Sequence, residues 1–301
     1  MKIFIAGATG AIGRPLVSQL LRAGHEVTGL ARNDESANQL RVQGAAAAIA
    51  DALDKQAVLD AVKRSAPEIV INQLTALPKR YRPETMKEAA PIDHRLRRDG
   101  GANLQAAAVA AGARRYILQS SAFWYEAGEG LADETASLAV NASPDIASGS
   151  RFYRELEQSA IAMRGPEVIF LRYGFLYGPG TWYARDGDAA DQMRSRQSPI
   201  VGDGNGVWSW VHVEDAAQAT VLALDRARGG AYNIVDDDPS PMRVWMMAYA
   251  RWLGAPEPPQ ISAEQAGDAD FIYYGTRLRG ASNAKAKREL GFQPRRLEWL
   301  I

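Results

Sequence analysis

The sequence predicts an α/β protein with a Rossmann-type, doubly wound parallel sheet and a smaller C-terminal substrate-binding lobe. Two observations predict this fold class. Short apolar runs alternate with segments of helical spacing along the first half of the chain, which is the pattern of strand–helix–strand crossovers. A glycine-rich turn, GATGAIG, separates the first apolar run from the first helical segment. Together they commit the N-terminal half to a parallel sheet.

The expected elements follow one another in order along the chain. Strands are expected at residues 2–6, 25–31, 46–50, 68–72 and 115–120, and helices around 15–21, at 35–43, at 55–64 and in a long stretch ending at 111–112. The texture of the sequence changes after residues 169–171. Loops rich in Gly, Pro and aromatic residues then precede a strand entering a helix at 211–224, a strand at 232–235 and a helix at 243–253. We therefore place a dinucleotide-binding Rossmann domain at 1–172 and a mixed segment, which completes the sheet and forms the substrate lobe, at 173–301.

The composition argues against several classes of protein. The 35 basic and 35 acidic residues balance, so the chain lacks the net charge that sequence-independent binding to nucleic acid or acidic membranes needs. Because the chain has no cysteine, it has no disulfide and no thiolate nucleophile. The spacing of a metal site is absent both from its three histidines, which include His212, and from the run Asp236-Asp237-Asp238. No run approaches the roughly eighteen apolar residues of a membrane span. We expect a cytoplasmic protein whose partner is a small molecule, not nucleic acid or a membrane.

The glycine-rich turn is the strongest functional motif. Glycines between a strand and a helix permit a tight turn and let the backbone approach a pyrophosphate. The free N–H groups and the dipole of the following helix stabilise such an anion. We predict that this turn binds a dinucleotide cofactor through Gly7, Thr9, Gly10, Ala11, Ile12 and Gly13.

The end of the second strand bears on the choice of cofactor. A site that prefers NAD normally has an acid there, which binds the ribose 2′-hydroxyl. Here Ala31 fills that position and Arg32 follows it, which suits the 2′-phosphate of NADP, unless Arg32 is only a solvated loop residue. Asp34 keeps NAD as an alternative. Asp51, at the end of the third strand, is expected either to accept a hydrogen bond from the adenine amino group or to serve as a turn or helix-cap residue.

Seven motifs carry a resemblance to a known family. They are GATGAIG, the Asp51 step, QSSAFWY, LRYGFLYGPGT, WVHVEDAA, YNIVDDDP and SNAKAKRELGFQP. In this order and spacing they resemble the extended and atypical short-chain dehydrogenases/reductases, the group that includes NAD-dependent epimerases and dehydratases. The resemblance runs from Lys2 to about Arg295. It implies an NAD(P)-dependent enzyme, and family members often form homodimers.

The resemblance also implies roles for particular residues. The family's catalytic serine stands four residues before a tyrosine, a spacing that Ser121 and Tyr125 match, and Ser121 would hydrogen-bond the substrate oxygen. The alternative for Ser121 is a turn residue that satisfies the backbone. Tyr173, Gly174 and Phe175 resemble the segment beside the nicotinamide.

The family's catalytic pair of tyrosine and lysine, four residues apart, is altered in this chain. The matching helix reads YRELE, so that Tyr153 takes the tyrosine position and Glu157 the lysine position, where a carboxylate would raise the pKa of the phenol. The resemblance leaves a second register open, because relatives often carry an acid four residues after the lysine. In that register Tyr153 takes the lysine position and Gly149 the tyrosine position. Tyr153 is therefore a candidate proton donor whose alternative is a helix-packing residue.

The substrate region departs from the sugar-nucleotide epimerases. Those relatives commonly have an arginine before the strand matched by WVHV, whereas this chain has Trp208-Ser209-Trp210. Together with Trp124, Trp182 and Tyr183 on the candidate loops, these rings favour an apolar or aromatic substrate, although each ring could instead belong to the core.

Three hypotheses for function follow. The leading one is an oxidoreductase that uses NADP, with NAD as the alternative, on a carbonyl, alcohol or polarised double bond of a non-nucleotide small molecule. The second is an isomerase, epimerase or dehydratase with a tightly bound, recycled dinucleotide. The third is a dinucleotide-binding sensor or scaffold protein without catalysis.

Overall fold

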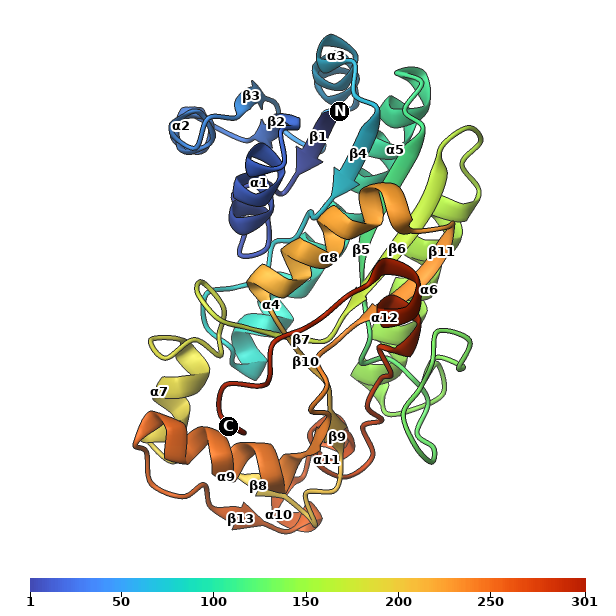
Figure 1. The fold of residues 1–301 in the computed structure, drawn as a ribbon. Helices are drawn as coiled ribbons and strands as arrows, with labels where there is room; N and C mark the ends of the chain where they lie inside the picture. Colours follow the sequence, from blue (N-terminus) through green and yellow to red (C-terminus); the bar gives the residue numbers. More distant parts are fainter. The chain divides into compact units, whose positions relative to one another are not determined.

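A seven-stranded sheet organises the structure, a computed structural model that describes residues 1–301 (Figure 1). Its strands lie in the order β11-β6-β5-β4-β1-β2-β3, which extends the Rossmann order by one strand. The pairs β1–β2, β1–β4, β2–β3 and β4–β5 are parallel. The strands are β1 (Lys2–Ala6), β2 (Glu26–Ala31), β3 (Ala46–Ile49), β4 (Ile69–Asn72), β5 (Arg115–Ser121), β6 (Glu167–Tyr173) and β11 (Gly230–Ile234). The predicted fold class is confirmed.

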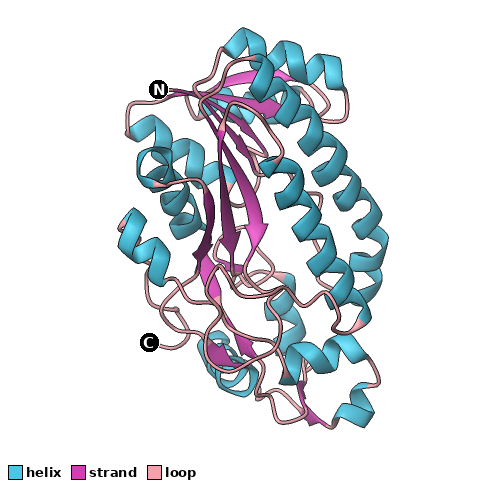
Figure 2. Cartoon of the chain, turned by 90° about the vertical axis from the view of Figure 1, so that its right-hand side faces the viewer, coloured by secondary structure: helices cyan, strands magenta, loops and turns pink.

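Helices lie on both faces of this sheet (Figure 2). They alternate with the strands as α1 (Gly13–Arg22), α2 (Asp34–Val42), α3 (Lys55–Ser65), α4 (Pro83–Arg95), a π-helical turn η1 (Leu96–Gly100), α5 (Gly101–Ala110), α6 (Pro144–Ile161) and α8 (Val213–Arg226). The expected helix ending at residues 111–112 is thus three segments, with a proline, Pro91, inside the first. None of the helices combines the length and apolar character that a membrane crossing requires.

The chain divides into two compact units, each assembled from separate segments. Unit 1 comprises Met1–Ser120, Glu155–Leu171 and Ala216–Ala231. Unit 2 comprises Ser121–Arg154, Arg172–Asp215 and Tyr232–Ile301. The chain therefore passes from one unit to the other at the C-terminal end of β5 and again within α6.

The core of unit 1 follows from the alternation of side chains along its strands. Phe4, Val70 and Tyr116 come from neighbouring strands and belong to one buried cluster with Val58 of α3 and Leu104 of α5. Residues of one parity on a strand face one side of a sheet, so these strands present a continuous apolar surface to the helices. This packing fixes the carboxyl ends of the strands, where the glycine turn and the second strand's Arg32 lie.

Unit 2 is built from short strands and an aromatic core. Its strand pairs are β7 (Phe175–Tyr177) with β10 (Trp210–His212), β9 (Val207–Trp208) with β12 (Ser240–Pro241), and β8 (Ile200–Val201) with β13 (Gln260–Ile261). Its remaining helices are α7 (Asp188–Arg194), α9 (Met242–Leu253), α10 (Ala263–Ala266), α11 (Ala269–Thr276) and α12 (Ala284–Leu290). Strands this short do not stabilise a sheet alone, so ring packing has to hold the unit together.

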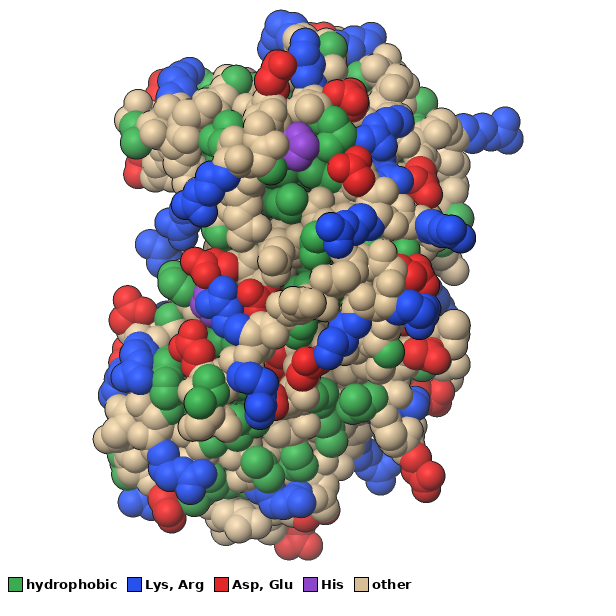
Figure 3. All heavy atoms as spheres, in the orientation of Figure 1, with side chains coloured by type: hydrophobic (Ala, Val, Ile, Leu, Met, Phe, Trp, Pro, Cys, Tyr) green, Lys and Arg blue, Asp and Glu red, His purple; other side chains and the backbone are tan.

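Charged side chains are interspersed on the molecular surface. On the face drawn in Figure 3, blue basic and red acidic side chains lie among one another, without a broad area of one sign. This distribution accords with the equal numbers of basic and acidic residues in the sequence.

Candidate functional site

The glycine turn of unit 1 has the backbone that its sequence predicts. Gly7 has a φ of +85°, and a Cβ there would lie 2.2 Å from the carbonyl oxygen of Gln73. A Cβ on Gly13 would lie 2.2 Å from the carbonyl oxygen of Gly7. These two glycines therefore fold the turn back on itself, whereas Thr9, Gly10 and Ala11 remain partly exposed. The first turn of α1 has neither an acidic residue nor a side-chain cap, so its N–H groups have no competing carboxylate.

The segment after β4 supports this turn from behind. The N–H of Gln73 donates to the carbonyl of Ala6 at 2.8 Å, which extends the strand past the glycine turn. Two and three residues after Gln73, the Thr75 hydroxyl and the Ala76 N–H donate hydrogen bonds to the carboxylate of Asp93. The buried Arg97 pairs with the same carboxylate at 2.7 Å. A fixed, paired cluster thus positions the backbone against which Gly7 packs.

Arg32 lies where the sequence places it, at the carboxyl end of β2. Ala31 is buried and Arg32 is exposed. Asn33 caps α2 by accepting a hydrogen bond from the Ser36 N–H at 2.9 Å, so the chain turns directly after Arg32. The Arg32 guanidinium has no carboxylate partner, which leaves its donors available to a ligand.

Asp51 has a structural partner of its own. Its Oδ1 accepts a hydrogen bond from the Leu53 N–H at 2.9 Å, and its carbonyl accepts from the Asp54 N–H. This is the geometry of an Asx turn, the turn role that the sequence left open. The side chain is exposed, and its second carboxylate oxygen is not used by the turn.

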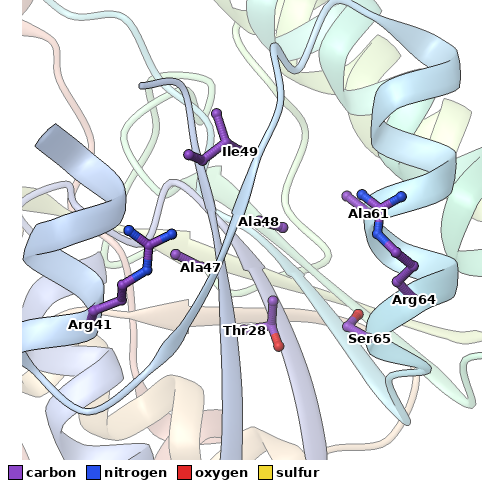
Figure 4. Close-up of a pocket in the computed structure, with 8 residues that line it drawn as sticks. All are labelled: Thr28, Arg41, Ala47, Ala48, Ile49, Ala61, Arg64 and Ser65. Atoms are coloured by element: carbon purple, nitrogen blue, oxygen red, sulfur yellow. The ribbon is translucent and has the colours of Figure 1, made fainter. Parts of the chain in front are cut away.

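A hollow of about 430 Å³ opens over the edge strand β3 of unit 1. Figure 4 shows Arg41 of α2 and Arg64 of α3 on either side of it, with Ala47 and Ala48 between them. None of the residues predicted to bind the cofactor lines this hollow. It is therefore separate from the glycine turn.

Ser121 is the last residue of β5 and the first residue of unit 2. Ser121 is 5% exposed, and its hydroxyl has no hydrogen-bond partner. Tyr125, four residues later, has a different role, because its hydroxyl donates to Asn233 at 2.6 Å and accepts from Arg172 at 3.0 Å. Burial raises the pKa of Tyr125 despite the nearby arginine charge. Ser121 is thus the free polar group of this pair, and Tyr125 is a buried structural residue.

The segment from Tyr173 to Phe175 is held by its backbone. The Ala122 N–H donates to the carbonyl of Tyr173, and the Phe175 N–H donates to that of Ser209, at 2.9 and 2.8 Å. A Cβ on Gly174 would lie 2.4 Å from the same Ser209 carbonyl oxygen. The segment therefore lies directly beside the loop that carries Ser121.

Trp124 fills the space beside Gly149 of α6. A Cβ at position 149 would lie 2.7 Å from Cη2 of the Trp124 ring, so only glycine fits there. The ring centroids of Trp124 and Tyr153 are 6.0 Å apart, and Tyr153 is half-buried. The indole thus covers Tyr153 and Gly149, which are the tyrosine positions of the family's catalytic pair in the first and the second register. This contact was missed from the sequence, although a glycine inside a helix is itself an unfavourable choice that asks for an explanation.

Glu157, in unit 1, is directed to the sheet. It is 8% exposed, and its Oε1 accepts a hydrogen bond from the Ser120 hydroxyl at 2.6 Å. A buried carboxylate with a committed donor on β5 is a structural anchor for α6.

The aromatic residues singled out in the sequence belong to a packed group in unit 2. Phe175 stacks between Phe123 and Trp208, with ring centroids 4.4 and 4.0 Å away, and Trp208 stacks on Trp210 at 5.7 Å. Trp208 and Trp210 are buried, whereas Trp182 is partly exposed. We call the following set the aromatic cluster: Phe175, Tyr177, Tyr183, Trp208, Trp210, Trp245, Tyr249 and Trp299.

The acidic run Asp236–Asp238 is not the solvated loop that its charge suggests. Asp236 is 2% exposed, and burial raises the pKa of its carboxyl to about 8. Asp237 pairs with Lys287 at 2.7 Å, and Asp238 pairs with Arg296 at 2.7 Å. His212 is a buried strand histidine whose Nδ1 accepts a hydrogen bond from the Glu214 N–H.

A family model matches most of this chain. The model of the NAD dependent epimerase/dehydratase family covers residues 3–235. The chain belongs to this family. The resemblance predicted from the motifs is thereby confirmed.

Relatives within the family include reductases as well as epimerases. A 3-diazoavenalumate denitrifying reductase from a Streptomyces species is 42% identical over 99% of this chain and 98% of its own length. A 2-alkyl-3-oxoalkanoate reductase from Stenotrophomonas maltophilia is 27% identical over 85% and 77%. The crystal structure of the Thermus thermophilus UDP-glucose 4-epimerase complexed with NAD is 25% identical, has a TM-score of 0.73 and covers 99% of this chain and 96% of that one. The predicted assignment as an NAD(P)-dependent oxidoreductase of the epimerase/dehydratase family is confirmed at this level.

Proposed function

We propose that the protein is an NADPH-dependent reductase of a small, apolar or aromatic molecule whose reducible group accepts hydride without a proton from a tyrosine. The observation that carries the proposal is the contact between Trp124 and Gly149. In the register that assigns Glu157 to the family's acid, position 149 is the tyrosine position, and the indole occupies its space. The bond between Glu157 and Ser120 supports that register, because the carboxylate is used by the sheet.

The residues of unit 1 suit a dinucleotide. Gly7 and Gly13 exclude side chains from the turn, and the first N–H groups of α1 meet no acid. Arg32 without a carboxylate partner, next to Ala31 in place of an acid, supports NADP over NAD. The bound cofactor supplies a hydride.

The residues of unit 2 suit an aromatic substrate. Ser121 has a buried, unpartnered hydroxyl that can donate to the substrate, and Trp124 and Phe123 provide ring surface on the same loop. Reduction of a ketone produces an alkoxide, which needs a proton. Hydride addition to a diazonium carbon breaks the C–N bond, releases N₂ and leaves a C–H bond, so it needs none. The diazo compound in the name of the Streptomyces relative supports this second class.

A panel of electrophiles tests the proposal. Purified protein is mixed with NADPH or NADH and with 3-diazo-4-hydroxybenzoate, a cyclic ketone or an aryl aldehyde, and NADPH oxidation and N₂ release are measured. We expect N₂ and 4-hydroxybenzoate from the diazo acid, one N₂ for each NADPH oxidised, and slow or no reduction of the carbonyl compounds. Faster turnover of a carbonyl compound than of the diazo acid would contradict the proposal.

A further inference from the structure

Two buried donors without partners lie three residues apart, one at the end of β5 and the other on the loop that follows it. They are the hydroxyl of Ser121 and the indole N–H of Trp124. A buried donor that makes no hydrogen bond costs about 1–3 kcal/mol, so its retention requires an explanation. Trp208 in the same unit shows the usual solution, because its N–H donates to the carbonyl of Tyr274 at 3.0 Å.

An unpartnered N–H alone does not single out Trp124. Trp210, Trp245 and Trp299 of the aromatic cluster share that property. The difference lies in position: only Trp124 is on the loop that directly follows Ser121, and its ring covers positions 149 and 153 of α6. Glycine inside a helix costs about 1 kcal/mol relative to alanine, and Gly149 is the residue that makes room for the ring.

An indole N–H is a donor only and is not a proton source at ordinary pH. It can orient and polarise an acceptor atom, as a tyrosine hydroxyl does, but it cannot complete a carbonyl reduction by proton transfer. This limitation matches a reaction in which hydride is the only species added to carbon.

We propose that Trp124 donates its indole N–H to the reducible group or adjacent oxygen of the substrate, beside Ser121, and so takes the hydrogen-bonding place of the family's tyrosine without its acidity. This inference deepens the proposed function and rests on it. Trp124 is then a substrate-binding, specificity-determining residue, and the substrate has a compact acceptor atom next to an electrophilic centre.

The kinetic test removes the N–H and keeps the ring. Trp124→Phe is compared with wild type and with the matched change Trp252→Phe. Trp252 lies on α9, and the guanidinium of Arg185 packs over its ring. With 3-diazo-4-hydroxybenzoate and NADPH, we expect Trp124→Phe to lower kcat/KM about tenfold, the value of one hydrogen bond. Trp252→Phe should keep the wild-type kcat/KM. The dissociation constant of NADPH should be the same in all three proteins.

A binding measurement reports on the N–H directly and needs no turnover. In protein carrying ¹⁵N-labelled indoles, the Trp124 resonance is assigned by its absence from Trp124→Phe. Addition of 4-hydroxybenzoate with NADP⁺ should shift this resonance downfield. The resonance of Trp252 should not move.

The possible failures are distinguishable. An unchanged kcat/KM in Trp124→Phe, or an unshifted Trp124 resonance at saturating ligand, would overturn the inference while leaving the proposed function intact. If wild-type protein neither turns over nor binds any diazo acid, the proposed function fails and this inference fails with it. If Trp124→Phe loses its cooperative thermal transition, Gly149→Ala is the second variant, because its Cβ displaces the ring, and a wild-type kcat/KM there would also overturn the inference.

Discussion

The hydroxyl of Ser120 donates a hydrogen bond to Oε1 of Glu157 at 2.6 Å. Both side chains are buried, one on β5 and the other on α6. This hydrogen bond joins α6 to β5 at the residue that precedes Ser121. It also gives Glu157 a hydrogen-bond partner on the sheet, which supports the register of YRELE in which Glu157 matches the family's acid.

Replacement of Glu157 by lysine should therefore damage the fold and restore no catalytic pair. Glu157→Lys places an ammonium in a buried position and leaves the Ser120 hydroxyl without its acceptor. We expect a loss of about 3 kcal/mol or more in the free energy of unfolding, measured by urea denaturation. The exposed neighbour Glu155→Lys serves as the control and should change it by less than about 0.5 kcal/mol. A stable Glu157→Lys protein that reduces ketones would show that the position does belong to the catalytic pair.

The fold was predictable because it depends on periodicity. Apolar alternation and the spacing of the helices predicted the ends of β1 to β5 to within one or two residues. The glycine-rich motif likewise predicted a tight turn, and Gly7 there has the positive φ that favours glycine. The sequence could not choose between the two registers of YRELE. The two registers differ in contacts between distant segments, namely Ser120 with Glu157 and Trp124 with Gly149. A glycine inside a helix signals a close neighbour at position 149, but the partner in either contact cannot be read from the local sequence.

The acidic run illustrates the same limit. Three consecutive aspartates predict a solvated loop, because each carboxylate prefers water. The structure buries Asp236 and pairs the other two with Lys287 and Arg296, which lie about fifty residues or more away in the sequence. Burial of a charge is decided by partners that local composition does not reveal.

Tyr153 should be dispensable for the reaction. Its ring packs near Trp124, and the proposed chemistry takes no proton from it. We expect Tyr153→Phe to keep kcat/KM for the diazo probe within about threefold of wild type at every pH from 6 to 9. Ser121→Ala is the comparison and should lose about tenfold, because it removes a donor to the substrate. A large loss in Tyr153→Phe that grows with pH would identify Tyr153 as the proton donor after all.

Arg32 should set the preference between the two dinucleotides. Arg32→Ala removes the guanidinium N–H donors at the end of β2. These donors are expected to bind the 2′-phosphate, which NADP has and NAD lacks. We expect the dissociation constant of NADPH, measured by fluorescence titration, to rise at least tenfold, and that of NADH to stay within twofold. Arg64→Ala, an exposed arginine of α3 beside the β3 hollow, is the control for lost positive charge. Equal weakening of both cofactors in Arg32→Ala would contradict the assignment.

Gly7 and Gly24 form a matched pair for testing the glycine turn. Both have positive φ, +85° and +78°, but a Cβ on Gly24 would meet nothing within 4 Å. Gly24→Ala should therefore lower the free energy of unfolding by only about 1–2 kcal/mol, which is the cost of a positive φ for an alanine. Gly7→Ala adds the collision with the Gln73 carbonyl, so it should cost more and abolish measurable NADPH binding. If Gly7→Ala binds NADPH as wild type does, the turn is not the cofactor site.

Asp236 should make the protein less stable as the pH rises. Burial, with the charges of Asp238, Asp237 and Asp215, raises the pKa of its carboxyl from the ordinary 3.8 to about 8. Between these values the folded protein keeps a proton that the unfolded chain releases. The stability that this group contributes is therefore fully present below pH 4 and is lost as the pH rises towards 8. Asp236→Asn cannot ionise, although its amide oxygen can still accept from the Asp238 N–H.

The measurement for Asp236 is a difference between two stability curves. The histidines, whose pKa values burial lowers, act in the opposite direction, and their effect cancels when wild type and Asp236→Asn are compared by urea denaturation from pH 4 to 9. We expect the free energy of unfolding of Asp236→Asn, relative to that of wild type, to increase progressively as the pH rises, by on the order of a few kcal/mol at pH 8. Parallel curves would mean that Asp236 is ionised in the folded protein. In that case the negative charge of Asp236 would help to raise the pKa of Tyr177, whose hydroxyl is buried in the same unit and has no partner.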